Sequence, residues 1–127
     1  MLDVETLGSK QVYANPWVTV REDTVRRPDG STGIYGVVDT SEIALIIPVD
    51  GDSVHLVEQY RHAVASRRWE FPSGSADPRL DVDAAALAAR ELREETGLVA
   101  SLLTPLGTLD VAPGMSNQRC PSSWPPT

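Results

Sequence analysis

The stretch that most constrains this chain is Arg90–Leu98, which reads RELREETGL. It places Glu91, Glu94 and Glu95 within little more than one helical turn. Glu91 and Glu95 are four residues apart and share a helix face, where two carboxylates about 6 Å apart repel by roughly 2–3 kcal/mol at an effective dielectric constant near 20. Arg90 precedes Glu94 by four residues and can neutralise that side chain. The Glu91/Glu95 pair has no such partner within the helix and therefore favours a bound cation, of which Mg²⁺ or Mn²⁺ suits hard oxygen ligands. The alternative is a solvated, salt-bridged helix face, which is what most Glu/Arg clusters are.

Length and charge exclude several classes of protein. A chain of 127 residues has the length of one domain, so we expect a single domain over residues 1–127. Its 18 acidic and 11 basic residues give a net charge of −7, which argues against nucleic acid or an anionic membrane as the main partner. The single cysteine, Cys120, excludes an internal disulfide framework and a cysteine zinc site. The sequence has no apolar run that could span a bilayer and no basic-then-apolar leader, so we expect a cytoplasmic protein.

Apolar alternation and turn signals predict strands in the first half of the chain, with residues 16–60 as the N-terminal strands. Residues 1–15 carry little pattern and fit either a leader arm or a first strand. One predicted strand starts at Trp17, and a second covers residues 33–38 after the Pro28-Asp29-Gly30 turn. The apolar run within residues 42–49 predicts a strand buried on both faces, with residues 54–60 as its hairpin partner through Asp50-Gly51. A further short strand is predicted at residues 69–72.

One helix is expected in the second half. Residues 73–83 are rich in Gly, Ser, Asp and Pro and predict a loop, in which Asp81 or Asp83 can cap a helix that runs from about Ala84 to Thr96. Gly97 is expected to end it. The predicted apolar stripe is Ala85, Ala88 (with Ala89) and Leu92, followed by a strand at residues 106–111 and a loop at residues 112–114. Strands, then one helix, then a strand is the order of an α+β fold or a mixed α/β sandwich.

These residues resemble those of a known family. Gly74, followed by the RELREETGL stretch, resembles the Nudix box, whose second half reads R-E-U-x-E-E-x-G-U with U aliphatic, and every fixed position of that half is met. The resemblance covers roughly residues 17–119 and implies a Nudix fold, with residues 69–98 as the Nudix-box loop and helix. Three further stretches resemble the ADP-ribose pyrophosphatase branch of this family: VEQYRHAV at residues 57–64, WEFPSG at residues 69–74 and LGTLDVAPG at residues 106–114.

The resemblance implies a metal-dependent hydrolase. Such an enzyme cleaves the pyrophosphate of a nucleoside diphosphate linked to another group, here ADP-ribose to AMP and ribose 5-phosphate, with Mg²⁺ or Mn²⁺ as the cofactor. Glu91 and Glu95 would be the main metal ligands, together with the backbone carbonyl of Ser73. Glu94 would either be an additional ligand or contact the ligands from behind, and it is one of the two residues expected to be catalytic. Arg90, the other of the two, would pair with an acidic neighbour and hold the loop against the helix.

Three residues are candidates for substrate binding. Arg61 can form a forked contact with phosphate oxygens, which lysine cannot, although an ordinary surface arginine at a strand end also fits. Glu70 lies between two aromatic residues, where substrate contact and edge-strand solubility fit equally. Gly74 joins them through the box resemblance. The aromatic residues Trp17, Tyr60 and Trp69 are expected in the core or an interface rather than as stacking platforms for adenine.

The first half of the box departs from the family pattern. The family has a glutamate six residues after the glycine and the arginine eight after that, whereas Arg90 lies sixteen residues after Gly74. Counting back from Arg90, the glutamate position falls on Val82. We therefore expect Asp81 or Asp83 to replace it after a two-residue insertion.

The C-terminal part departs further. A glutamate often follows the APG loop in this family, but here the residues are Ser116-Asn117-Gln118, and a neutral amide cannot accept a proton from water as a carboxylate does. Family members continue through further strands and a helix, whereas residues 120–127 have the prolines of an irregular tail. If Ser122 and Ser123 are encoded by the four-fold serine codons (TCN), reading the codons of residues 121–126 two bases later gives mostly apolar residues. We therefore favour a truncated or frameshifted C-terminus over a natural short form.

The sequence therefore predicts an α+β fold, a mixed α/β/α sandwich of the Nudix type that lacks its last strands and helix. Exposed sheet edges would favour a homodimer. The expected partner is a small-molecule nucleoside diphosphate. Two alternatives stay open: a catalytically weak or inactive Nudix-like module that binds nucleotide or metal, and a structural dimerisation domain with a merely charged helix.

Overall fold

The Pro28-Asp29-Gly30 turn joins two long antiparallel strands, as the sequence predicts. A computed structural model describes residues 3–75 and 83–124 of the chain and places β2 at Val18–Arg26 and β3 at Thr32–Thr40, with Arg26 opposite Thr32. Gly30 has φ +86° and donates its N–H to the Arg27 carbonyl at 2.9 Å, a conformation that favours glycine.

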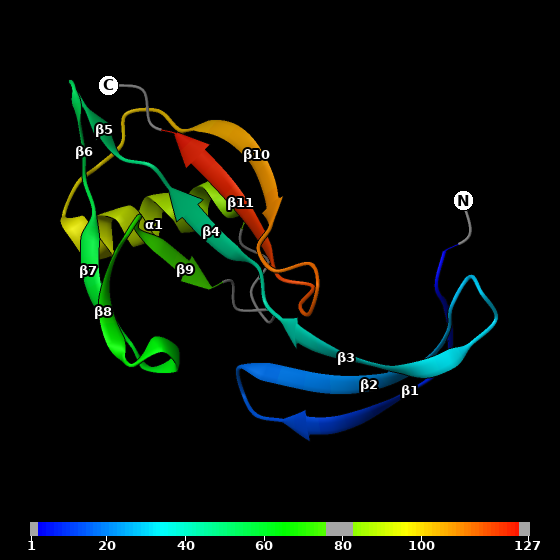
Figure 1. The fold of residues 1–127 in the computed structure, drawn as a ribbon. Helices are drawn as coiled ribbons and strands as arrows, with labels where there is room; N and C mark the ends of the chain where they lie inside the picture. Colours follow the sequence, from blue (N-terminus) through cyan, green and yellow to red (C-terminus); the bar gives the residue numbers. More distant parts are fainter. Residues whose placement is uncertain (1–2, 76–82, 125–127) are drawn as a thin grey trace. The chain divides into compact units, whose positions relative to one another are not determined.

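Residues Glu5–Ala14 form β1, which pairs antiparallel with β2 and is exposed along its length. Residues 5–14 therefore form a first strand and not a leader arm. Among the described residues, β1, β2 and β3 make a sheet in that order, with β1 at one edge (Figure 1).

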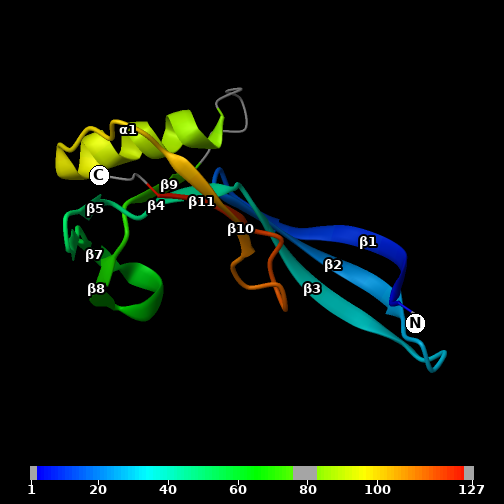
Figure 2. The ribbon, with the colours of Figure 1, turned by 90° about the horizontal axis from the view of Figure 1, so that it is seen from above.

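A second sheet carries the helix. Its order within the described residues is β10 (Thr104–Asp110), β11 (Arg119–Trp124), β4 (Ile43–Ile46) and β9 (Ser73–Ser75). Helix α1 (Ala84–Thr96) packs against β4, β9 and β11 on one side of this sheet (Figure 2). The core between them consists of Ala44, Ile46, Leu87, Ala88 and Leu92, with Leu98, Ala100 and Leu103 packed against it.

The bounds of α1 agree with the prediction, and its ends show why. The Asp83 side chain accepts the Ala86 N–H at 2.9 Å, and Gly97 closes the helix with φ +75° and an N–H bond to the Arg93 carbonyl. The predicted apolar stripe is correct at Ala88 and Leu92 but wrong at Ala85 and Ala89, which are exposed. Leu87 is buried instead, because the sheet meets the helix on a face rotated toward that residue.

The predicted strand at residues 54–60 is interrupted. Val49–Asp50 (β5) and Ser53–Val54 (β6) form a minimal hairpin, and Val57–Arg61 (β7) pairs with Ser66–Glu70 (β8) across a short 3₁₀ turn at His62–Val64. Pro48 has no N–H to continue a ladder from β4, and both sides of β4 are already taken by β9 and β11. The expected hairpin of residues 54–60 with the 42–49 run is therefore confirmed next to the Asp50-Gly51 turn, where Val49 pairs with Val54, and wrong for β4 and β7.

Strand β4 itself is less buried than its apolar sequence predicts. Ala44 and Ile46 are buried, while Ile43 and Leu45 are half-buried, so the strand alternates instead of being buried on both faces. The loop predicted for residues 73–83 is also wrong at its start, since Ser73–Ser75 form β9 and pair antiparallel with β4. The second predicted capping residue, Asp81, and Val82 lie outside the described residues.

The tail predicted to be irregular contains a strand. Ser122 and Ser123 of β11 pair in parallel with Leu45 and Ile46, and the Ile47 N–H donates to the Ser123 carbonyl at 3.0 Å. The Ser122 hydroxyl donates to the Gly107 carbonyl of β10 at 3.1 Å, so the strand fills the position between β10 and β4. Pro121 removes only one backbone N–H donor from this strand. The side chains of Cys120, Ser122 and Ser123 are small enough to be buried in the interior of the sheet. Pro125 and Pro126 lie outside the described residues, and the frameshift stays a prediction.

The chain's contacts divide it into two units, one made of residues 1–41 and 110–118 and the other of residues 42–109 and 119–127. The first unit contains the β1–β3 sheet, and the second contains α1 with its sheet and the β7–β8 hairpin. The prediction of one domain stays a prediction. Across the described ranges, no helix has the length and apolar character needed to cross a bilayer.

The aromatic residues expected in a core or an interface are exposed. Trp17, Tyr60 and Trp69 lie at 78%, 57% and 67% exposure, so a core position is wrong for all three. Tyr60 lies on β7, Trp69 lies on β8, and Trp17 directly precedes β2. An interface role for them stays a prediction.

Candidate metal centre

Strand β9 and helix α1 meet at Gly74 and Glu91. A Cβ on residue 74 would overlap the Glu91 carboxylate and its Cγ, so glycine is what allows this side chain to lie against the strand. The Glu91 side chain is only 15% exposed. Burial, and secondarily the charge of Glu94, raises the pKa of Glu91, whereas Arg90 lowers it.

Glu95 lies one turn further along α1 and is half-buried. Its Oε2 is buried and has no hydrogen-bond partner within the described part of the chain, while Oε1 accepts a contact from Gln59 Nε2 at 3.5 Å. Burial is the main cause that raises the pKa of Glu95, and the charge of Glu91 adds to it; hydrogen bonding by the Ser73 backbone is the largest effect in the opposite direction. A buried carboxylate oxygen to which no described residue donates within hydrogen-bond distance is costly, because its solvation by water is lost.

The remaining charges of the predicted cluster lie at the surface. Arg90 Nη2 is 3.8 Å from Glu91 Oε1, and Arg90 Nε is 4.0 Å from Glu94 Oε1. The expectation that only Glu94 has a basic neighbour within the helix is therefore wrong, since Arg90 lies between both carboxylates. Glu94 is 58% exposed and takes no part in the buried pair.

Arg61 of β7 and Glu70 of β8 form an ion pair, although Arg61 lies opposite Ser66 in the strand ladder and not opposite Glu70. Arg61 Nε donates to Glu70 Oε2 at 2.6 Å and Arg61 Nη2 to Oε1 at 2.9 Å, a two-pronged pair. This hydrogen bonding with Glu70 is the main reason why the pKa of Arg61 is raised, and the charge of Glu95 contributes as well. Neither interpretation of Glu70, substrate contact or edge-strand solubility, includes this pairing with Arg61.

The residues at this place fit a hard divalent cation. Glu91 and Glu95 supply carboxylate oxygens, one of them buried and without a donor in the described part of the chain, and the glycine at position 74 leaves room for the Glu91 side chain. The backbone of Ser73 lies within hydrogen-bonding reach of Glu95, next to the same carboxylates. Within the described residues, no three His, Cys, Asp or Glu side chains gather as a metal cluster, so backbone oxygen, water or substrate would complete the coordination.

Gln59 is the residue that the sequence did not single out. It lies two residues before Arg61 on β7, and side chains two apart in a strand point to the same face. That periodicity, applied to the neighbour of a suspected substrate residue, is the signal that could have found it.

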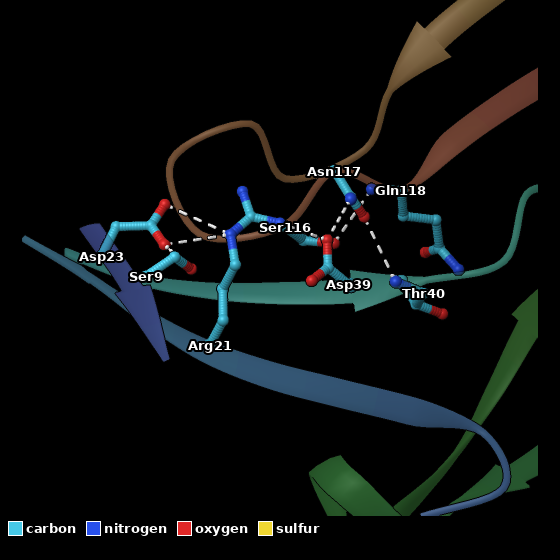
Figure 3. A network of polar contacts seen from close by, with 8 residues as sticks. All are labelled: Ser9, Arg21, Asp23, Asp39, Thr40, Ser116, Asn117 and Gln118. Atoms are coloured by element: carbon cyan, nitrogen blue, oxygen red, sulfur yellow. Dashed lines mark hydrogen bonds and ion pairs between the residues drawn. The ribbon is translucent and has the colours of Figure 1, made fainter. Parts of the chain in front are cut away.

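A separate polar network lies within the first unit (Figure 3). Arg21 Nη1 donates to Asp39 Oδ1 at 2.7 Å, and the same oxygen accepts Asn117 Nδ2 at 2.5 Å. Asn117 Oδ1 in turn accepts the Thr40 N–H at 3.2 Å. Gln118 belongs to the Ser116-Asn117-Gln118 segment, where the resemblance leads us to expect a glutamate, and donates its amide to the Ser41 carbonyl at 3.2 Å. The segment after the Ala112-Pro113-Gly114 loop is thereby held on β3 by amide side chains.

Asp23, in the same network, is buried at 6% exposure. It accepts the Ser9 hydroxyl at 2.6 Å and Arg21 Nε at 3.2 Å from each carboxylate oxygen. The Ser9 hydrogen bond is the main cause that lowers the pKa of Asp23. The network ties β1, β2 and β3 to the 115–118 segment.

Comparison with known proteins identifies two matching family models. A model of the NUDIX domain matches residues 40–124, and a model of the nucleoside diphosphate sugar hydrolase N-terminal domain matches residues 4–38. The solved crystal structure of an ADP compounds hydrolase aligns with a TM-score of 0.86 at 25% identity, over 98% of this chain and 68% of that one. The predicted α+β fold of the Nudix type is therefore confirmed.

Curated relatives also match this chain, and the activities in their names differ. An ADP-ribose pyrophosphatase of Mycobacterium tuberculosis is 38% identical over 122 residues, and a methanol dehydrogenase activator of Bacillus methanolicus is 27% identical over 119 residues. These alignments take in 91% and 93% of this chain but 56% and 63% of those proteins, so the chain spans little more than half the length of these relatives. Because the NUDIX model matches most of its residues, the chain belongs to the Nudix family.

Proposed function

We propose that this protein hydrolyses the pyrophosphate of a nucleoside diphosphate linked to another group, with Mg²⁺ or Mn²⁺ as its cofactor. ADP-ribose, cleaved to AMP and ribose 5-phosphate, is the proposed substrate. The observation that carries the proposal is the buried Oε2 of Glu95, which has no hydrogen-bond partner among the described residues and lies on α1 beside Glu91 and Gly74. The similarity to a mycobacterial ADP-ribose pyrophosphatase supports the choice of substrate.

In the proposed reaction, Glu91, Glu95 and the Ser73 carbonyl hold the metal, with Glu94 as an additional ligand near the surface. A bound divalent ion supplies neutralisation of the diphosphate charge and activation of a water for in-line attack on phosphorus. Arg90 lies between Glu91 and Glu94 and limits their mutual repulsion.

The β7–β8 hairpin supplies the substrate side of the proposal. Glu70 holds the guanidinium of Arg61 through Nε and Nη2, which leaves Nη1 to donate to a phosphate oxygen. Glu70 therefore acts here by orienting Arg61. Gly74, proposed as a substrate-side position, contributes by leaving Glu91 its place against β9.

The test is release of phosphate from ADP-ribose in the presence of Mg²⁺ and an added phosphatase, which acts on both expected products but not on ADP-ribose itself. Wild-type protein should release phosphate, and Glu95→Gln, which keeps the size of the side chain and removes its charge, should reduce the rate at least about a hundredfold. Equal rates in the two proteins would contradict the proposal. A panel of other nucleoside diphosphate sugars in the same assay measures substrate preference.

A second candidate is a nucleotide- and metal-binding module with weak or no turnover. It is favoured by Gln118, whose amide donates to a carbonyl and cannot accept a proton from water. Calorimetry with ADP-ribose and Mn²⁺ that detects binding, together with no phosphate release, would favour this candidate. The substitution Gln118→Glu should then increase turnover from its background level.

A homodimer and a cytoplasmic location complete the proposal. Strand β1 lies at a sheet edge, is exposed throughout and carries apolar Leu7, Val12 and Tyr13. The lone cysteine fits a reducing compartment. Light scattering coupled to gel filtration should give twice the mass of one chain, and a monomer at all concentrations would contradict the dimer.

A further inference from the structure

The two oxygens of the Glu95 carboxylate lie in different surroundings. Oε1 faces the side-chain amide of Gln59, and Oε2 is buried without a partner among the described residues. Gln59 is itself half-buried on β7, a strand that belongs to the same unit as α1. The amide therefore meets the carboxylate in a place from which water is partly excluded.

The basic group whose charge acts on Glu95 is already engaged. Arg61 follows Gln59 by two residues and is close enough to Glu95 to affect it electrostatically, but its Nε and Nη2 hydrogen-bond to Glu70. The group that touches Glu95 from β7 is thus a neutral donor and not a cation. A neutral donor orients a carboxylate and leaves its negative charge available, whereas an ammonium or guanidinium would neutralise it.

We propose that Gln59 is a positioning residue for Glu95, in which the amide fixes Oε1 and thereby leaves Oε2 to bind a divalent cation. The inference rests on the proposed function, because it takes Glu95 to be a metal ligand. It adds a residue from the β7–β8 hairpin to a centre otherwise made by α1 and β9. Partners that orient a ligand in this way commonly change metal affinity by tenfold or more when they are removed.

The experiment measures Mn²⁺ affinity from the free-ion signal in electron paramagnetic resonance, with the full chain and no substrate. Gln59→Leu, which keeps bulk and removes the donor, should weaken Mn²⁺ binding about tenfold. Gln59→Lys, which places a positive charge on the carboxylate, should weaken it further, by about a hundredfold or more. The matched control is Gln11→Leu on exposed β1, which should bind Mn²⁺ as the wild type does.

Comparison with stability separates positioning from a structural role. If Gln59 only packed the hairpin, the loss of Mn²⁺ affinity in Gln59→Leu would follow its loss of unfolding free energy in urea. We expect Gln59→Leu to bind Mn²⁺ more weakly than the wild type even under conditions in which the two proteins are equally folded. The spectrum of bound Mn²⁺ should also change in Gln59→Leu, because its coordination loses a fixed carboxylate.

The outcomes distinguish this inference from the proposed function. Wild-type-like affinity in both Gln59 variants, with binding still lost in Glu95→Gln, would overturn the positioning role and leave the proposed metal centre intact. No Mn²⁺ binding by the wild type, or equal binding by Glu95→Gln, would overturn both.

Discussion

The Glu91 side chain occupies the space that a Cβ at position 74 would need. Replacing Gly74 with alanine must therefore push Glu91 away from β9 or separate the strand from α1. We expect Gly74→Ala to cost about 1–3 kcal/mol of unfolding free energy, as overpacking does, and to weaken Mn²⁺ binding at least tenfold.

Urea denaturation and Mn²⁺ titration measure the two effects of Gly74→Ala. The matched control is Gly36→Ala in β3, where a Cβ would meet nothing within 4 Å, and its stability should stay within about 0.5 kcal/mol of the wild type. Equal behaviour of the two alanine variants would contradict the close approach of Glu91 to Gly74.

The raised pKa of Glu95 gives the metal-free protein a pH dependence of defined sign. Its carboxyl has a pKa above the ordinary 4.5, because of burial first and the charge of Glu91 second. The folded state thus holds this proton more tightly than the unfolded state, and the stability that it contributes falls as pH rises from about 4.5 through the folded-state value. Glu95→Gln removes that loss.

Urea unfolding in the presence of a chelator, from about pH 4 to pH 8, tests this dependence. The stability of Glu95→Gln relative to the wild type should increase with pH, and added Mn²⁺ should stabilise the wild type only. Parallel stability curves for the two proteins would show that the Glu95 carboxyl is not desolvated.

The amide of Asn117 is a donor to Asp39 and an acceptor from the Thr40 N–H. Asn117→Asp keeps the size and the acceptor but places a second carboxylate against Asp39. We expect a loss of about 1–2 kcal/mol and faster hydrogen exchange at the Thr40 amide. The double variant Asn117→Asp/Asp39→Asn removes the repulsion and should recover part of the loss; no recovery would mean that the two side chains do not interact.

Two leucines near each other in sequence test the placement of the core. Leu92 is 2% exposed within the α1 core, whereas Leu102 is 60% exposed. Leu92→Ala should cost about 2–5 kcal/mol and Leu102→Ala less than about 0.5 kcal/mol in urea unfolding. Similar costs for both would place Leu102 in an interface, and that variant should then dissociate an oligomer.

The elements that depend on neighbours in sequence could be predicted. Helix α1 follows from strong helix formers between an aspartate cap and a glycine end, and its carboxylate pair follows from the four-residue spacing of Glu91 and Glu95. The turn at Gly30 and the paired strands on either side follow from turn chemistry and alternation. These are local interactions, which the chain makes wherever its other parts lie.

The tertiary structure decided what depends on distant partners. The Cys120-Pro121-Ser122-Ser123 segment becomes a strand because β4 and β10 present unpaired edges on both sides of it, and no local pattern reveals those edges. Leu87 is buried in place of Ala85 because the sheet determines which face of α1 is covered.

The candidate metal centre likewise depends on both local and long-range interactions. The carboxylates are set by helical spacing, whereas the burial of Glu95 Oε2 without a partner among the described residues and the contact of Glu95 with Gln59 require α1 and β7 to meet. The pairing of Arg61 with Glu70 requires the β7–β8 hairpin to close. The sequence by itself thus determined the charged groups and the helix that carries them. Only the tertiary structure decided which of those charges lose water, because burial is a property of the packed whole and not of any single segment.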